Sequence, residues 1–212
     1  MQQTLNIKAI FYLILHLIPC ISLGLISPVM ASQKTVLDWQ RLPLENSTKE
    51  KLISDNALYC KSKVESDEAT QSLQYFIAGL HKKNCRVALS KLSQYERFSE
   101  FIDFVEKSSY DEKSKRITLY LGHLLLPFDM ILDFEIPRIK KPGIYPFHFD
   151  KGFLKGLTGE ISVSTHRNRC LFVSEARWKG PKSRIPDQVF SFFSQALGKN
   201  AMETLFRISL TR

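Results

Sequence analysis

The sequence has few of the residues and motifs that most catalytic sites require. It contains four cysteines in 212 residues, no C-x-x-C pair and no Cys/His cluster at zinc spacing, so we expect no metal site. No G-x-S-x-G nucleophile elbow occurs, and Gly152, Gly156 and Gly159 lie between strand-like runs rather than before a helix, so we expect no phosphate loop. Beyond residue 31 the histidines each stand alone in their segments: His81, His123, His148 and His166. These absences argue against a catalytic set and predict no cofactor, although an enzyme is left open.

The N-terminus has the pattern of a secretory signal peptide. A thin basic region at Lys8 precedes an almost wholly apolar run over residues 9–26, and Val29, Met30 and Ala31 offer a cleavage site after Ala31. The alternative is an uncleaved anchor formed by residues 9–26, because the run is nearly long enough to span a membrane. We therefore divide the chain into a signal peptide over 1–31, an N-terminal extension over 32–56 and one domain over 57–212.

Export to an oxidising compartment would allow a disulfide. The mature chain would keep Cys60, Cys85 and Cys170, so at most one internal bridge can form and one thiol is left over. Cys60 and Cys85 are the nearest pair in sequence, but spacing alone does not establish the pairing.

The formal net charge is +9, and the basic residues are spread along the chain. Spread charge indicates a solvated surface with a weak attraction for an anionic membrane. Nothing resembles a nucleic-acid-binding motif, so we expect no nucleic-acid partner, and we expect a monomer.

The periodicity of the apolar residues predicts an α+β domain. A helix is expected near Ser47–Ser54, capped by Ser47 or Thr48, and the helical pattern over 86–106 should be broken near Ser93–Gln94 or Ser99 into two short helices. Apolar residues alternate in several later runs, which is the pattern of half-buried antiparallel strands. The expected strands cover residues 57–64, 72–81, 117–121, 128–136, 145–149, 157–164 and 171–178.

The last segment predicts one long helix. Ile185 and Pro186 open it, and it runs from Asp187 to about Ile208. Apolar residues recur every three or four positions, which places them on one face of the helix. This stripe contains Val189, Phe193, Leu197, Ala201, Leu205 and Ile208. A sheet followed by such a helix must bury the helix against the sheet.

In this order of elements the chain resembles the helix-grip superfamily called START-like or SRPBCC, over roughly residues 72–207. The residues in the short-helix region that match the family pattern are Leu92, Tyr95, Glu96, Phe98, Phe101 and Val105, whereas Gln94, Ser99 and Asp103 replace an acid and two prolines of that pattern. Further similarity lies in the glycines at 152, 156 and 159 and in the segment from Ile185 to the closing helix through Arg207. The resemblance implies a curved antiparallel sheet around a long C-terminal helix, with two short helices after the first strand.

The resemblance also implies a cavity between the sheet and the last helix that holds a lipid, quinone or polyketide-like molecule. The expected ligand-binding residues are Leu119, Leu121, Met130, Leu132, Phe134, Phe147, Phe149, Phe193, Leu197 and Leu205. Periodicity alone does not distinguish a lined cavity from a filled core, so three hypotheses stay open. They are a carrier of a hydrophobic molecule, a cyclase or hydrolase that uses the same cavity, and an envelope-associated interaction protein with a filled core.

The acidic residues of the alternating run over 128–136 could be imagined as paired carboxylates. They are Asp129, Asp133 and Glu135, and their alternation with large apolar residues predicts that they face water instead. His123 is expected to be a satisfied histidine of the core or rim.

Overall fold

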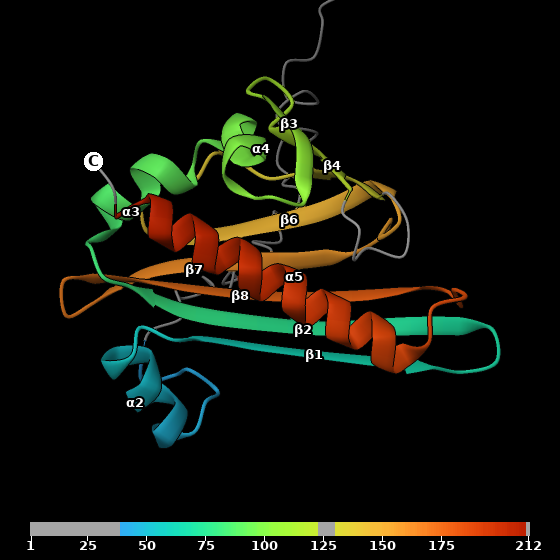
Figure 1. The fold of residues 1–212 in the computed structure, drawn as a ribbon, viewed down its shortest axis with the longest axis horizontal. Helices are drawn as coiled ribbons and strands as arrows, with labels where there is room; N and C mark the ends of the chain where they lie inside the picture. The colour runs from blue at the N-terminus through green and yellow to red at the C-terminus, as the bar shows by residue number, and fades with distance from the viewer. Residues whose placement is uncertain (1–38, 123–129, 211–212) are drawn as a thin grey trace, which may run out of the picture. The chain divides into compact units, whose positions relative to one another are not determined.

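The computed structural model describes residues 39–122 and 130–210. The signal peptide predicted over 1–31, and with it the alternative anchor over 9–26, lies outside the described residues, as do Phe128, Asp129 and His123. The described residues form an eight-stranded antiparallel sheet in the order β1-β2-β8-β7-β6-β5-β4-β3 (Figure 1). The strands are β1 Leu58–Ser66, β2 Thr70–His81, β3 Val105–Asp111, β4 Arg116–Leu121, β5 Met130–Glu135, β6 Gly143–Gly152, β7 Thr158–His166 and β8 Arg169–Pro181. The helical elements are α2 Asn46–Ser54, α3 Cys85–Leu92, the 3-10 turn η1 Tyr95–Arg97, α4 Phe98–Phe101 and α5 Asp187–Ile208.

The sheet is a meander from β3 to β8, and β8 then pairs with β2. Each strand of the meander pairs with its successor in the sequence. The pairing of β2 with β8 joins segments about a hundred residues apart and brings His81 opposite Cys170. The α+β helix-grip arrangement predicted from the sequence is therefore confirmed. Two strands precede the short helices, as the periodicity predicted, whereas the resemblance implied one.

The sheet has apolar side chains on both faces. On the outer face, Leu80 and Leu171 are buried together with Leu42 and Leu52, so α2 and the residues before it cover this part of the sheet. Because side chains alternate along a strand, the neighbouring residues of β2 point to the inner face, where α5 lies. The predicted helix near Ser47–Ser54 is confirmed, but the predicted cap is wrong. Glu45 is the N-cap residue and makes no side-chain capping hydrogen bond.

The short helices separate where the sequence indicated, at Ser93–Gln94. The helical pattern was expected to continue to Glu106, and this is wrong for its last five residues, because α4 ends at Phe101 and β3 begins at Val105. Val105 is 3% exposed and pairs with Leu121 as the first residue of β3. Pairing with β4 therefore decides the structure of this segment, although the spacing of its apolar residues fits a helix equally well.

Helix α5 has the predicted bounds and crosses the inner face of the sheet, where it packs mainly on β1 and β2 (Figure 1). Val189 was expected on its buried stripe, and this is wrong. Val189 is 40% exposed, whereas Phe190, the next residue, is 4% exposed. The buried stripe therefore runs through Phe190, about 100° further round the helix. None of the helices in the described part of the chain is long and apolar enough to cross a membrane.

Polar contacts fix both ends of α5. At its first turn, the Asp187 carboxylate accepts hydrogen bonds from Ser66 Oγ at 2.6 Å and from Gln71 Nε2 at 2.7 Å. These hydrogen bonds lower the pKa of Asp187. Just beyond the last turn, Ser209 Oγ lies 2.8 Å from the Nε2 atom of His81, which is 1% exposed. The helix is thus held at two points of β2, which sets its distance from the rest of the sheet.

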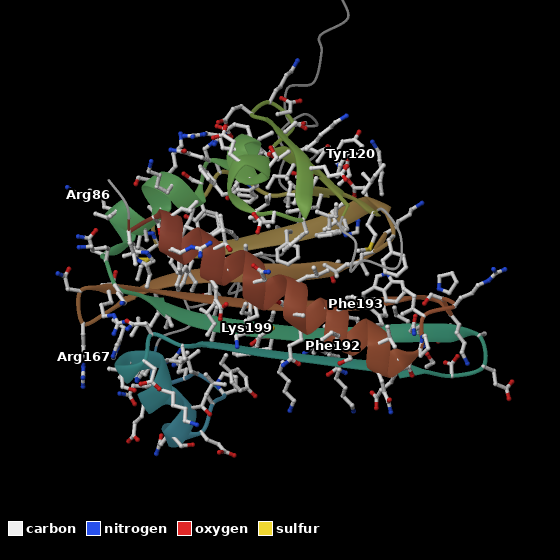
Figure 2. The ribbon with its side chains drawn as sticks, in the orientation of Figure 1. Arg86, Tyr120, Arg167, Phe192, Phe193 and Lys199 are labelled. Atoms are coloured by element: carbon white, nitrogen blue, oxygen red, sulfur yellow. A yellow bond between two sulfur atoms is a disulfide. The ribbon has the colours of Figure 1, made fainter. Side chains whose placement is uncertain are left out.

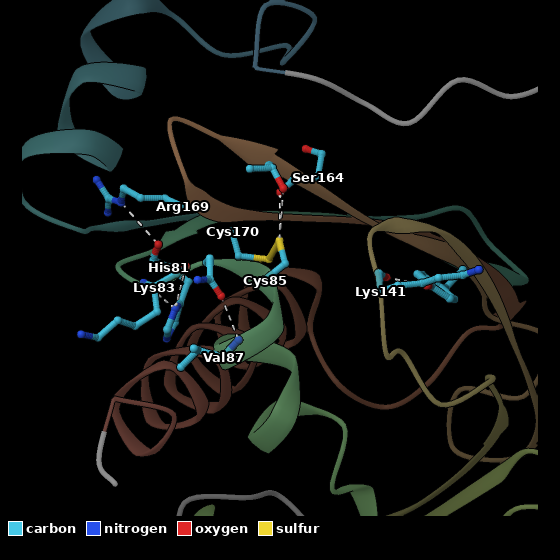
Figure 3. Close-up of a disulfide and its surroundings, with 11 residues drawn as sticks. His81, Lys83, Cys85, Val87, Lys141, Ser164, Arg169 and Cys170 are labelled. Atoms are coloured by element: carbon cyan, nitrogen blue, oxygen red, sulfur yellow. Dashed lines mark hydrogen bonds between the residues drawn. A yellow bond between two sulfur atoms is a disulfide. The ribbon is translucent and has the colours of Figure 1, made fainter.

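A disulfide joins Cys85 to Cys170 (Figure 3). Cys60 is a free, partly buried thiol. Of the pairings that the sequence left open, the nearest one, Cys60 with Cys85, is therefore not the one formed. The register of the sheet explains the outcome. Cys170 lies opposite His81, and the chain turns directly from His81 into α3, which begins at Cys85.

The expectation that the carboxylates of β5 face water holds for Glu135 but is wrong for Asp133. Asp133 is 7% exposed. Its carboxylate forms an ion pair with Arg116 and accepts a hydrogen bond from Thr118 Oγ1 at 3.1 Å. Arg116 also pairs with Asp150 of β6, so a cross-strand network on the outer face, rather than water, satisfies this carboxylate.

Candidate functional site

A cavity of about 320 Å³ lies between α5 and the inner face of the sheet. Helix α5 makes its main sheet contacts with β1 and β2, at one side of the sheet. Large apolar side chains from the more distant strands and from the α3–α4 region meet the helix across this space. The cavity is therefore a consequence of where α5 is anchored.

The strands contribute alternate residues to the wall. The pairs are Leu73 and Tyr75 of β2, Leu119 and Leu121 of β4, Met130 and Leu132 of β5, Phe147 and Phe149 of β6, and Ser174 and Ala176 of β8. Each pair is two positions apart, so both of its side chains point to the same face of the sheet. Helix α5 contributes residues at helical spacing: Phe190, Phe193, Ser194, Leu197, Gly198, Ala201 and Leu205.

The structure places nine of the ten sequence-predicted site residues in this wall. They are Leu119, Leu121, Met130, Leu132, Phe147, Phe149, Phe193, Leu197 and Leu205. Phe134 does not line the cavity. Its ring stacks on that of Phe149 with centroids 4.4 Å apart and supports the wall from behind. That any of these side chains contacts a ligand stays a prediction.

Sequence reasoning missed several residues of the wall. Leu73 and Tyr75 lie in a strand that was expected, and their period of two was the signal that could have placed them on the inner face. Phe190 was missed because Val189 fits the same helical spacing. Phe98 and Ile102 carry no comparable signal, since they lie in short irregular elements whose orientation is set by packing.

Among the described residues that line the cavity, the polar side-chain groups are hydroxyls. They belong to Tyr75, Ser174 and Ser194, and no Asp, Glu, His, Lys, Arg or Cys is among the described residues that line the cavity. Burial raises the pKa of Tyr75, so its phenol stays protonated and neutral. For the part of the chain that the structure describes, no cluster of His, Cys, Asp and Glu could hold a metal ion. The described lining can accommodate an apolar molecule.

Gly198 makes room for the Tyr75 hydroxyl. A Cβ atom at position 198 would lie 1.8 Å from Tyr75 Oη. Glycine inside a helix costs about 1 kcal/mol relative to alanine, so a reason for it is expected in the packing. Here the reason is that the helix backbone and the phenol oxygen approach each other directly.

The thiol of Cys60 contacts the same phenol. Cys60 Sγ lies 3.4 Å from Tyr75 Oη and 3.6 Å from the Gln195 carbonyl oxygen. Burial raises the pKa of this thiol, so it is a weak nucleophile. Its position favours a packing role between β1 and α5.

No family model matches the chain, and no curated protein matches it. Solved structures do match. The protein TTHA0849 from Thermus thermophilus aligns with a TM-score of 0.54 and 10% identity, covering 65% of this chain and 97% of that one. The di-domain ARO/CYC protein StfQ from the steffimycin biosynthetic pathway aligns with a TM-score of 0.53 and 8% identity, covering 65% of this chain and 50% of that one. A START superfamily protein from Mycobacterium smegmatis aligns at 0.48 with 7% identity, covering 66% of this chain and 97% of that one.

At these identities the likeness shows the fold alone. The alignments with TTHA0849 and StfQ cover about two thirds of this chain. The element order, the antiparallel sheet and the long closing helix agree with the resemblance drawn from the sequence. The chain has the START-like helix-grip fold.

Proposed function

We propose that this protein is an exported binding or carrier protein for a hydrophobic small molecule, held between the sheet and α5. The observation that carries the proposal is the cavity of about 320 Å³ with an almost wholly apolar wall. Small-molecule sites have volumes of about 300–1,000 Å³, so a single compact ligand fits. Burial of its apolar surface contributes roughly 25 cal/mol per Å². A lipid, a quinone or a polyketide-like compound has the required character, and the last of these is consistent with the likeness to StfQ.

The alternatives are a cyclase or hydrolase and a protein with a filled core. An enzyme of this type needs at least two polar or titratable side chains that converge on the ligand. The described lining supplies only three hydroxyls, and none has a neighbouring base in the wall. The presence of a cavity speaks against a filled core. Both observations favour the carrier.

The proposal of export has two supports. The first is the signal-peptide pattern of residues 1–31, with residues 9–26 as an anchor in the alternative. The second is the disulfide between Cys85 and Cys170, a bond that persists in oxidising compartments. N-terminal sequencing of the protein recovered outside the cytoplasm tests this proposal. A chain that begins after Ala31 supports it, and recovery of the whole chain in the membrane fraction supports the anchor.

Native mass spectrometry after gentle purification tests the binding function. The wild-type protein should carry a co-purifying apolar molecule. Leu132→Trp and Leu197→Trp should abolish this added mass without unfolding the protein, because each places an indole in the cavity from an opposite wall. Val189→Trp is the matched control, since Val189 lies on the same helix and is 40% exposed. Retention of the ligand by both cavity variants would contradict the proposal.

We also propose peripheral contact with an anionic membrane. Phe192 is 68% exposed, and it lies beside Phe193, which lines the cavity (Figure 2). An exposed phenylalanine on the helix that walls the cavity, on a protein of net charge +9, suits insertion into an anionic lipid surface. The residue that would enter the lipid, Phe192, is then adjacent in α5 to Phe193, which lines the cavity.

A further inference from the structure

The lining residues that carry a hydroxyl are gathered in one sector of the cavity. Tyr75 of β2, Ser174 of β8 and Ser194 of α5 form this polar sector, and β2 and β8 are adjacent strands. In their register Tyr75 lies opposite Ala176 and Ser174 lies opposite Ile77, so Tyr75 and Ser174 are diagonal neighbours on the inner face. Ser194 lies one helical turn before Gly198, which touches the Tyr75 hydroxyl. The walls built by β4, β5 and β6 contribute only hydrocarbon and thioether groups.

The sector has unused hydrogen-bonding capacity. The Ser174 hydroxyl makes no hydrogen bond to any residue of ranges 39–122 and 130–210. The Ser194 hydroxyl donates to the Phe190 carbonyl oxygen at 2.8 Å and can still accept. The Tyr75 oxygen accepts from the Cys60 thiol at 3.4 Å, which leaves its own hydrogen for another acceptor. The wall therefore offers both donors and acceptors within the polar sector.

All of this capacity is uncharged. A carboxylate or ammonium group buried against such a wall would lose its hydration without gaining a counter-charge, which is far more costly than burial of a neutral oxygen. A fully saturated hydrocarbon would leave the three hydroxyls facing apolar atoms. A neutral molecule with one hydrogen-bonding oxygen avoids both penalties.

We propose that the cavity selects uncharged, mainly apolar molecules that carry a single carbonyl or hydroxyl oxygen, and that the polar sector binds this oxygen. The inference rests on the proposed binding function and narrows its ligand to one chemical class. In the bound state the oxygen lies beside β2 and β8, and the hydrocarbon part extends along β4, β5 and β6.

Displacement of the neutral fluorescent reporter N-phenylnaphthylamine by four molecules of matched chain length tests the proposal. They are dodecane, lauryl alcohol, methyl decyl ketone and laurate at neutral pH. A neutral hydrogen bond contributes about 1–1.5 kcal/mol, so the alcohol and the ketone should bind about tenfold more tightly than dodecane. Laurate should bind more weakly than the alcohol.

Variants of the polar sector locate the effect. Ser174→Ala together with Tyr75→Phe should weaken binding of the alcohol about tenfold and leave dodecane binding unchanged. Tyr145→Phe and Ser191→Ala are the controls, because Tyr145 donates to the Lys141 carbonyl oxygen and Ser191 to the Ser62 carbonyl oxygen, and neither lines the cavity.

The outcomes separate the two proposals. Equal affinity for dodecane and the alcohol, tighter binding of laurate, or an unchanged alcohol affinity in the double variant overturns the inference while the binding function stands. Failure of the reporter and of every chain to bind overturns both.

Discussion

The disulfide between Cys85 and Cys170 should supply a large part of the stability of the domain. It closes a loop with a sequence separation of 85, and the loss of chain entropy in the unfolded state corresponds to about 4.5 kcal/mol for a loop of this size. Cys170 is 0% exposed and Cys85 is 5% exposed, so the double variant Cys85→Ala/Cys170→Ala also loses some packing. We expect a loss of about 3–5 kcal/mol in the free energy of unfolding.

Urea unfolding measures this loss. With an m-value of about 2 kcal/mol per M, the midpoint of the double variant should fall by roughly 2 M, and m should rise because the unfolded chain without the bridge exposes more surface. Dithiothreitol should lower the midpoint of the wild type by a similar amount and leave that of the double variant where it is. Cys60→Ala is the control, since Cys60 is outside the bridge. A shift below about 0.5 M in both comparisons would refute the reasoning, and so would alkylation of Cys85 or Cys170 in unreduced protein unfolded in urea.

Three further predictions concern a turn, a pair of glycines and an exposed ring. Hydrogen bonds from the Thr70 side chain and backbone, and from the Ala69 backbone, lower the pKa of Asp67 to about 2. The ionised carboxylate therefore stabilises the β1–β2 turn at pH values above the unfolded-state pKa of about 4, and this stabilisation is lost as the pH falls toward 2. Asp67→Asn should therefore reduce the pH dependence of the urea midpoint in this window. Gly152→Ala should lower the free energy of unfolding by about 2–3 kcal/mol, because φ is +81° and the new Cβ would lie 1.8 Å from a backbone oxygen of β5. Gly156→Ala should lower it by only about 1 kcal/mol, because φ is +90° but nothing lies within 4 Å of the new Cβ. Phe192→Ser should reduce co-sedimentation with anionic vesicles several-fold and leave ligand binding unchanged. Equal sedimentation of the variant and the wild type would contradict the proposal that this ring inserts into the membrane.

Many helices and strands of the fold could be predicted from the periodicity of their apolar residues, because each has one buried face and one solvent-exposed face. Helix α5 shows a 3.6-residue stripe, and β4 and β5 show a period of two, since each packs one side against the cavity or core. The pattern failed where non-local contacts decide. Val105 joins β3 because β4 lies beside it, and Asp133 is buried because Arg116 lies on the neighbouring strand.

The site was predictable in part for the same reason. Most of its apolar wall belongs to strands whose inner face the alternation identified. The hydroxyls of Ser174 and Ser194 were not predictable, because a serine in a strand or helix gives no sign of whether its neighbours satisfy it. The pairing of Cys85 with Cys170 likewise depends on the register of β2 and β8, which spacing along the chain does not contain.

The order of the elements makes the cavity the last feature to be completed during synthesis. The hairpins from β3 to β7 can form from neighbouring segments, but β2 gains its second partner only when β8 has been made, and α5 follows β8. A nascent chain lacking the residues after Pro181 would have a sheet with an open apolar face and no enclosed space. If the cavity binds a hydrophobic molecule as proposed, its binding site is therefore completed only after α5 has been made.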